Sequence, residues 1–179
     1  FTQDYTYTYM PWVWRCYPTD PLFIVDLVDP AHPVVRGQLE IPGYSTYIEP
    51  DGDRLIAVGR EDNDIAVSLF DVSDADAPTQ IQRVYPGKSA DSSHYSWTEA
   101  EWEHRAVTYL PDQGKLIVPV QTWDDTSYVF STQTINVTHD SLALGPVVKM
   151  KDQARRGTSL KGYLVSISGR ELAVHTDPP

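Results

Sequence analysis

Apolar and polar positions alternate along most of the chain in short runs, and no stretch keeps the 3.6-residue period of a helix. Runs of four to eight residues rich in β-branched and aromatic side chains are separated by Pro, Gly, Asp and Asn. Such runs are typical of strands. The 14 prolines also disfavour long helices. The pattern therefore predicts an all-β chain built from antiparallel hairpins.

Two stretches, 21–41 and 66–85, repeat one another. Each has an apolar strand, an Asp followed by Leu or Val, a second Asp three positions after the first, and a Pro seven positions after it. Asp26 in the first copy corresponds to Asp71 in the second, an offset of 45 residues. That offset equals the length of one four-stranded propeller blade.

The copies also agree downstream, where 49–60 and 110–121 each contain Pro-Asp, a Gly, a basic residue and then Leu-Ile. These features predict a tight turn inside a hairpin. The predicted organisation is an N-terminal edge strand or linker (1–19), a first blade repeat (20–65), a second blade repeat (66–127) with an insertion (86–105), and a degenerate third blade with a final hairpin (128–179).

The N-terminal stretch FTQDYTYTYMPWVW has the alternation of a strand, with Tyr5, Tyr7 and Tyr9 on one face and Thr6 and Thr8 on the other. An exposed strand of this kind would be prone to aggregate. We therefore expect it to be paired, either within its own blade or as a strand added to a neighbour.

Four segments carry a resemblance to a known family: 20–50, 67–78, 98–120 and 155–176. Together they resemble a family of secreted β-propeller domains distantly related to WD40 repeats. Glu103-His104-Arg105-Ala106 looks like the family's acid-His-basic-Ala signature, with Glu where Asp is usual. The resemblance covers the C-terminal part of a domain several hundred residues long. It implies about three blades of four-stranded antiparallel sheets, in a propeller that is incomplete or is closed or extended by other chains.

The resemblance implies a non-enzymatic extracellular scaffold or interaction module, because the family occurs mainly in large secreted or surface proteins. In an open arc of blades, the outward faces of the first and last blades stay exposed to solvent. The chain would then be a piece of a larger secreted or surface protein, would close with copies of itself, or would be a subunit of an extracellular fibril. The expected partners are other propeller blades or further copies of the chain.

Charge and composition limit the classes of molecule that the chain could bind. The net charge is −11 and the sequence pI near 4.7, which argues against nucleic acid and anionic membranes. No apolar run approaches the roughly 20 residues of a membrane-spanning helix. Cys16 is the only cysteine, so a disulfide could form only with another chain or another part of a longer chain. Asn136-Val137-Thr138 is an N-glycosylation sequon, usable if a eukaryote secretes the protein.

The most chemically suggestive stretch is WTEAEWEHRA, residues 97–106. Read as a strand, it places Glu99, Glu101 and Glu103 on one side and His104 on the other, packed side. We predict that His104 forms a structural polar pair with Glu103 or with a carboxylate of an adjacent blade.

A metal site is the alternative interpretation, with His94, Glu101 and His104 as ligands. Calcium could bind at EDND (61–64) or near Asp51 and Asp53, although the EF-hand spacing is absent. Apart from calcium, no cofactor is expected. No nucleophile elbow, P-loop or dinucleotide motif is present, so no catalytic residue is predicted. The rival function is a metal-dependent or carbohydrate-processing enzyme with its site near 94–104.

Overall fold

The computed structural model describes residues 4–10, 13–19, 21–88, 95–123 and 127–176. In this part of the chain the regular structure consists of strands and three short 3₁₀ helices, which confirms the predicted all-β class. The strands are β1 (Asp4–Met10), β2 (Val13–Thr19), β3 (Leu22–Asp26), β4 (Val34–Leu39), β5 (Tyr44–Asp51), β6 (Arg54–Glu61), β7 (Asp64–Asp71), β8 (Thr79–Val84), β9 (Tyr95–Trp97), β10 (Thr108–Leu110), β11 (Lys115–Trp123), β12 (Tyr128–Thr138), β13 (Ser141–Met150), β14 (Ala154–Leu160), β15 (Tyr163–Ser168) and β16 (Leu172–Thr176). The 3₁₀ helices are η1 (Glu99–Glu101), η2 (His104–Ala106) and η3 (Pro111–Gln113).

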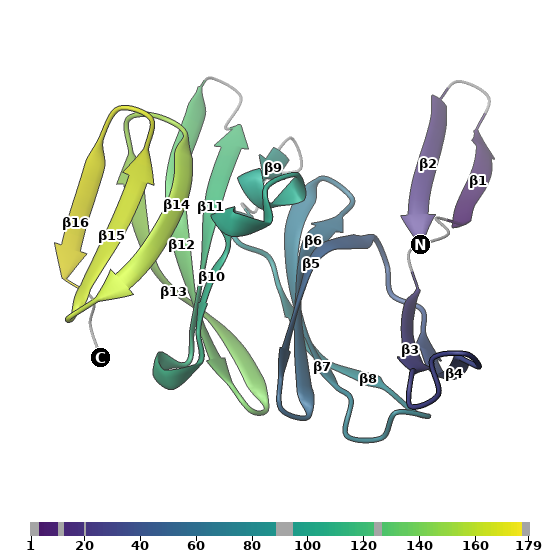
Figure 1. Cartoon of the computed structure of the whole chain (residues 1–179). Coiled ribbons are helices and arrows are strands. Elements are labelled where there is room, and N and C mark those ends of the chain that lie inside the picture. The colour runs from purple at the N-terminus through teal and green to yellow at the C-terminus, as the bar shows by residue number, and fades with distance from the viewer. Residues whose placement is uncertain (1–3, 11–12, 20, 89–94, 124–126, 177–179) are drawn as a thin grey trace.

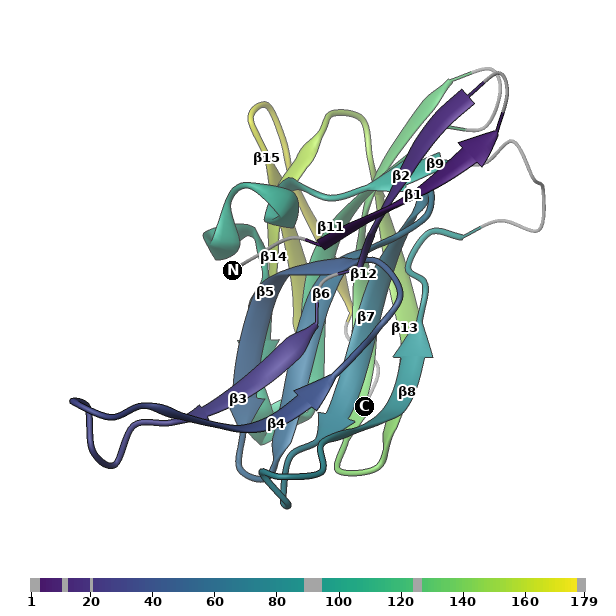
Figure 2. The same cartoon turned by 90° about the vertical axis from the view of Figure 1, so that its right-hand side faces the viewer.

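The strands form antiparallel sheets that stand side by side as blades (Figure 1). We call β5–β8 the first blade; its four strands pair in sequence order. The second blade is β10–β13, with β9 paired to the far end of β11. The last sheet is β14–β16, and the β3–β4 ribbon lies on the opposite side of the two blades (Figure 1). The view turned by 90° shows the sheets one behind another, as expected for face-to-face blades (Figure 2).

Local sequence explains the regular hairpins. In the first blade, β6 and β7 are joined by only two residues, Asp62 and Asn63. Asp62 has φ of 50°, the left-handed conformation that two-residue hairpin turns use and that Asp tolerates better than most residues. Both strands are buried on their two faces, so they read as nearly continuous apolar runs rather than as an alternating pattern.

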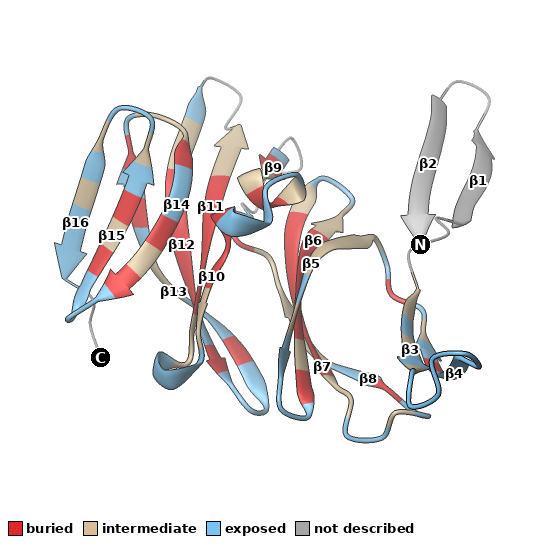
Figure 3. Cartoon of the chain, viewed as in Figure 1, coloured by how far each residue is buried: buried red, intermediate tan, exposed pale blue. Residues whose placement is uncertain are grey.

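The main core lies between the first and second blades, where the buried residues gather (Figure 3). Ile56 and Leu69 of the first blade and Leu116 and Ile135 of the second are fully buried in it. A smaller core with Leu164 joins the second blade to the last sheet. Burial of these faces supplies most of the energy that holds the arc together.

The sheets are out of phase with the repeats that the sequence suggested. The boundary predicted between residues 65 and 66 falls inside β7, and residue 128 begins β12 within the second blade. The reason is that each sequence repeat starts at the third strand of a sheet rather than the first. The N-terminal strand β1 pairs with β2, in a hairpin of its own. None of the helices in the described residues is long or apolar enough to cross a membrane.

Candidate functional site

The stretch 97–106 interrupts the first strand of the second blade, so that this strand is divided into β9 and β10. β9 pairs with one end of β11 and β10 with the other, and η1 and η2 bulge out between them. The predicted continuous strand is therefore wrong. We call this bulge, residues 98–107, the inter-blade bridge.

A capping box explains why the bridge turns instead of extending. The Thr98 hydroxyl accepts from the Ala100 amide at 3.2 Å, and the Glu101 carboxylate accepts from the Thr98 amide at 3.3 Å. Glu103 begins η2 in the same way, accepting from the Arg105 amide at 3.0 Å. Ser/Thr followed three residues later by Glu is a known helix-start signal. Thr98-x-x-Glu101 could thus have been found in the sequence.

Glu101 ties the bridge to the first blade. Its carboxylate accepts from Arg60 Nη2 at 2.9 Å, and the same nitrogen donates to the Ser96 carbonyl at 2.8 Å. The side chains of Arg60 and Glu101 are nearly buried, at 13% and 11% exposed. Burial acts to lower the Arg60 pKa, but the hydrogen bond and charge of Glu101 outweigh it and raise that pKa above its ordinary value. Burial, reinforced by the Glu101 charge, also raises the pKa of Tyr44, whose hydroxyl lies 3.5 Å from the carboxylate.

Glu99 ties the same bridge to the last sheet. Its carboxylate accepts from Arg155 and, at 3.0 Å, from the Gln153 side-chain amide. Between the two glutamates, the Ala100 carbonyl accepts from the Thr46 hydroxyl of β5 at 3.2 Å. One short segment of the second blade therefore contacts the sheets on both of its sides. Each carboxylate is neutralised by an arginine, as a structural bridge requires.

His104 and Glu103 do not form the predicted structural pair. His104 is exposed, with its ring edge-on to Tyr47 at 6.4 Å between centroids, and the Glu103 carboxylate caps η2 instead. The predicted burial of His104 is wrong because it rested on the strand alternation that the bulge replaces. Trp102, beside them, is 64% exposed.

The predicted metal ligands are not assembled by the described residues. Glu101 is bound by Arg60, and His94 lies outside the part of the chain that the structure describes. Among the described residues there is no group of three side chains that could hold a metal ion. The His94, Glu101 and His104 site remains a prediction, without a geometry in its favour.

The acidic turns considered for calcium also have protein partners. Glu61 accepts from Arg83 at 2.7 Å and from the Tyr85 hydroxyl at 2.6 Å. Asp51 accepts from the Tyr109 hydroxyl at 2.5 Å, and Asp64 pairs with Lys88 at 3.0 Å. Cationic and hydroxyl donors thus occupy oxygens that a hard cation would need.

A second polar cluster, which the sequence did not reveal, joins the first blade to the β12–β13 turn. Arg54 is buried and donates to the His139 carbonyl at 2.8 Å, while it pairs with Asp71 at 3.0 Å. His139 lies 2.7 Å from Asp140 and 3.2 Å from Asp53. The available signal was Arg54 itself, the basic residue of the repeated Pro-Asp turn. Its buried charge needs these partners.

The two remaining positions singled out in the sequence lie on strands. Asn136 is exposed on β12, paired with Lys115 and Ala143, and its sequon residue Thr138 is also exposed. Cys16 lies on β2, opposite Tyr7 of β1.

Fold and contacts together define a set of propeller blades joined by apolar faces and polar bridges. The profile of the β-propeller domain matches residues 17–174, and the chain belongs to this family. An uncharacterized protein of Archaeoglobus fulgidus is 31% identical over 160 residues, which are 89% of this chain and 23% of that protein. One from Methanocaldococcus jannaschii is 45% identical over 67 residues, 36% of this chain and 11% of that protein. The chain thus spans less than a quarter of the length of these curated relatives.

Proposed function

We propose that this β-propeller domain is a non-enzymatic extracellular scaffold that binds neighbouring blades through the outer face of its last sheet. The observation that carries the proposal is the apolar character of that face. Register places Ile167 opposite Leu172 and Val165 opposite Val174, so these four side chains share one side of the sheet. Leu172 is 62% and Val174 52% exposed.

The inner side of the same sheet shows what such a surface is for. Leu164, which points the other way, is 3% exposed and packs on Ile117 and Val148 of the second blade. The last sheet therefore uses one face as a blade interface and leaves the other open. A contiguous exposed apolar face marks an interaction surface.

The edge of the last sheet supports the same interpretation. β16 pairs with β15 alone among the described strands, whereas the first and second blades each have four strands in order. A free strand edge offers unpaired backbone groups to an added strand. A partner with a fourth strand and an apolar blade face would satisfy both features.

The partners we propose are further propeller blades, from the rest of a larger secreted or surface protein or from copies of this chain in a fibril. The much greater length of the relatives supports the first source. The resemblance to secreted propellers supports an extracellular location, and Asn136 is exposed, as a glycosylation site would require. The alternative, an enzyme acting near 94–104, gains little from the geometry, because arginines hold Glu99 and Glu101.

Replacing the two exposed residues Leu172 and Val174 by lysine tests the docking face. We expect the unaltered chain to self-associate with rising concentration in sedimentation velocity. The double variant should weaken that association at least about tenfold. Val28→Lys is the matched control, because Val28 is exposed on the loop of the β3–β4 ribbon, far from the last sheet. Equal association of all three proteins would rule out this face.

A further inference from the structure

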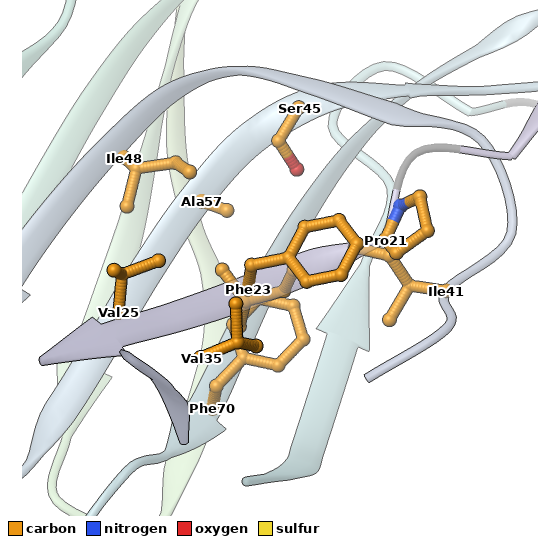
Figure 4. A pocket seen from close by; sticks show the side chains of 10 residues that line it. Pro21, Phe23, Val25, Val35, Ile41, Ser45, Ile48, Ala57 and Phe70 are labelled. Atoms are coloured by element: carbon orange, nitrogen blue, oxygen red, sulfur yellow. The ribbon is translucent and has the colours of Figure 1, made fainter. Parts of the chain in front are cut away.

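An apolar cavity of about 360 Å³ lies between the β3–β4 ribbon and the first blade (Figure 4). Phe23, Val25 and Val35 line it from the ribbon, and Ile48, Ala57 and Phe70 from the first blade. β3 pairs only with β4 among the described strands, so its other edge is free. An open apolar cavity beside a free strand edge is the surface that an added strand would cover.

Repeated side-chain hydrogen bonds identify the ribbon as the outer half of a blade. The Asp26 carboxylate accepts from the Val28 amide at 2.8 Å, and Asp71, 45 residues later, accepts from the Ser73 amide at 2.9 Å. β3 and β4 thus correspond to β7 and β8. In the first blade, β7 pairs with β6 on the side away from β8, and β6 pairs in turn with β5. The ribbon lacks these two inner strands.

The ribbon is fixed on the first blade at its outer end. Arg36 of β4 forms a bidentate pair with Asp76, at 2.7 and 2.6 Å. Leu22 and Leu39 pack on Ala57 and Phe70. The position that inner strands would occupy is therefore already set by the ribbon.

The chain carries two strands in the right place to fill this position. β1 and β2 form a hairpin of two seven-residue strands immediately before β3, so that β1 to β4 follow one another as β5 to β8 do. In the structure this hairpin forms its own sheet, apart from the first blade (Figure 1). We propose that the β1–β2 hairpin docks along the free edge of β3, covers the cavity and completes a four-stranded blade with the ribbon.

Turn chemistry sets the register of this docking. A two-residue turn like that at Asp62 needs positive φ, but Pro21 is fixed near φ −65°. A three-residue loop, 19–21, would need the left-handed conformation at Pro21 and is excluded for the same reason, so the connection needs four residues, 18–21. That loop places Tyr17 opposite Leu22 and Cys16 opposite Phe23.

This inference goes beyond the docking function proposed for the last sheet, because it concerns the other end of the arc. Once docked, the hairpin covers the part of the first blade's face that the ribbon leaves open. At this end of the molecule, a neighbouring chain could then bind only to the newly completed blade. The two proposals can fail separately, since neither experiment involves the other's residues.

The only native cysteine allows a direct test in the full chain. Phe23→Cys should form an intramolecular disulfide with Cys16 under mild oxidation, because opposite residues of an antiparallel pair fit disulfide geometry. We expect monomer mobility on a non-reducing gel and the mass loss of two hydrogen atoms. Ile24→Cys, on the opposite side of β3, is the matched control and should cross-link at least about tenfold less.

A cross-linked dimer would overturn the proposal by showing that the hairpin docks on a second copy. Absence of the disulfide in the Phe23→Cys protein would also overturn it. Hydrogen exchange on the unaltered chain gives an independent measurement if that variant does not fold. Protection of the amides of both 13–17 and 22–26 is expected, and rapid exchange of either segment would contradict the docking.

Discussion

The interface between the first and second blades and the outer face of the last sheet are both made of branched apolar residues, yet they differ in how far those residues are exposed to solvent. Ile56 and Leu69 lie in the interface and are fully buried. Leu172 and Val174 lie on the outer face and are more than half exposed. What differs is the neighbour, since each blade face is stable only when another sheet covers it.

Polar contacts follow the same division. The pair of Arg60 with Glu101 and the cluster around Arg54 are both at the covered interface, where they bridge different sheets. On the outer face, apolar residues stand without a second sheet. Charged pairs therefore fix how the two blades align at the covered interface, while the outer face offers apolar surface to a partner without such charged pairs.

Truncating a leucine in each region gives the largest contrast. Leu69→Ala should lower the free energy of unfolding by roughly 2–5 kcal/mol, because it leaves a cavity in the main core. Leu172→Ala, the matched control, should change it by less than about 0.5 kcal/mol, because that side chain is largely in water. Urea denaturation of both variants measures the two values. Similar losses would mean that the last sheet is already covered in solution.

Removing the charge of Glu101 tests the polar half of the comparison. Glu101→Gln should cost about 2 kcal/mol, because Arg60 stays nearly buried and loses its ionic partner. Glu103→Gln is the matched control on the same bridge and should cost little, since Glu103 is exposed. Thermal unfolding at neutral pH compares them. An equal effect of the two changes would show that the bridge does not depend on its buried pair.

The repeat at 21–41 and 66–85 was enough to predict an all-β propeller class, because the Asp turns and the Pro positions recur in register. Its phase was not predictable. A sequence repeat fixes a period, and the sheet boundaries depend on which hairpins pair. The predicted boundary between residues 65 and 66 follows the turn at Asp62 and Asn63, and nothing in the sequence distinguishes this turn within a blade from a connection between blades.

The site was predicted less well, for a definite physical reason. Alternation applied to 97–106 assumed a strand, but the capping box at Thr98 and the cap at Glu103 fold the segment into two short turns. That local signal was present in the sequence. The partners Arg60 and Arg155 were not visible, because they come from other blades and only the packing of the sheets brings them within reach.

The smallest expected effect is an acid sensitivity centred on Glu61, in the β6–β7 hairpin. Burial acts to raise its pKa, but the Tyr85 hydroxyl and Arg83 outweigh burial and hold that pKa below the ordinary value of about 4.3. The unfolded chain thus binds the proton more readily. The stabilising contribution is complete above the unfolded pKa and is lost as pH falls through the lower folded pKa.

Unfolding free energies of the unaltered chain and of Glu61→Gln, measured between neutral pH and about pH 3, test this sign. The difference between them should shrink towards low pH and stay below about 1 kcal/mol, because the Glu61 carboxylate is partly solvated. Tyr85→Phe removes one donor and keeps the carboxylate, so it should lose only part of the acid sensitivity. A difference that grows on acidification would mean that the folded carboxyl takes up its proton more readily than the unfolded one.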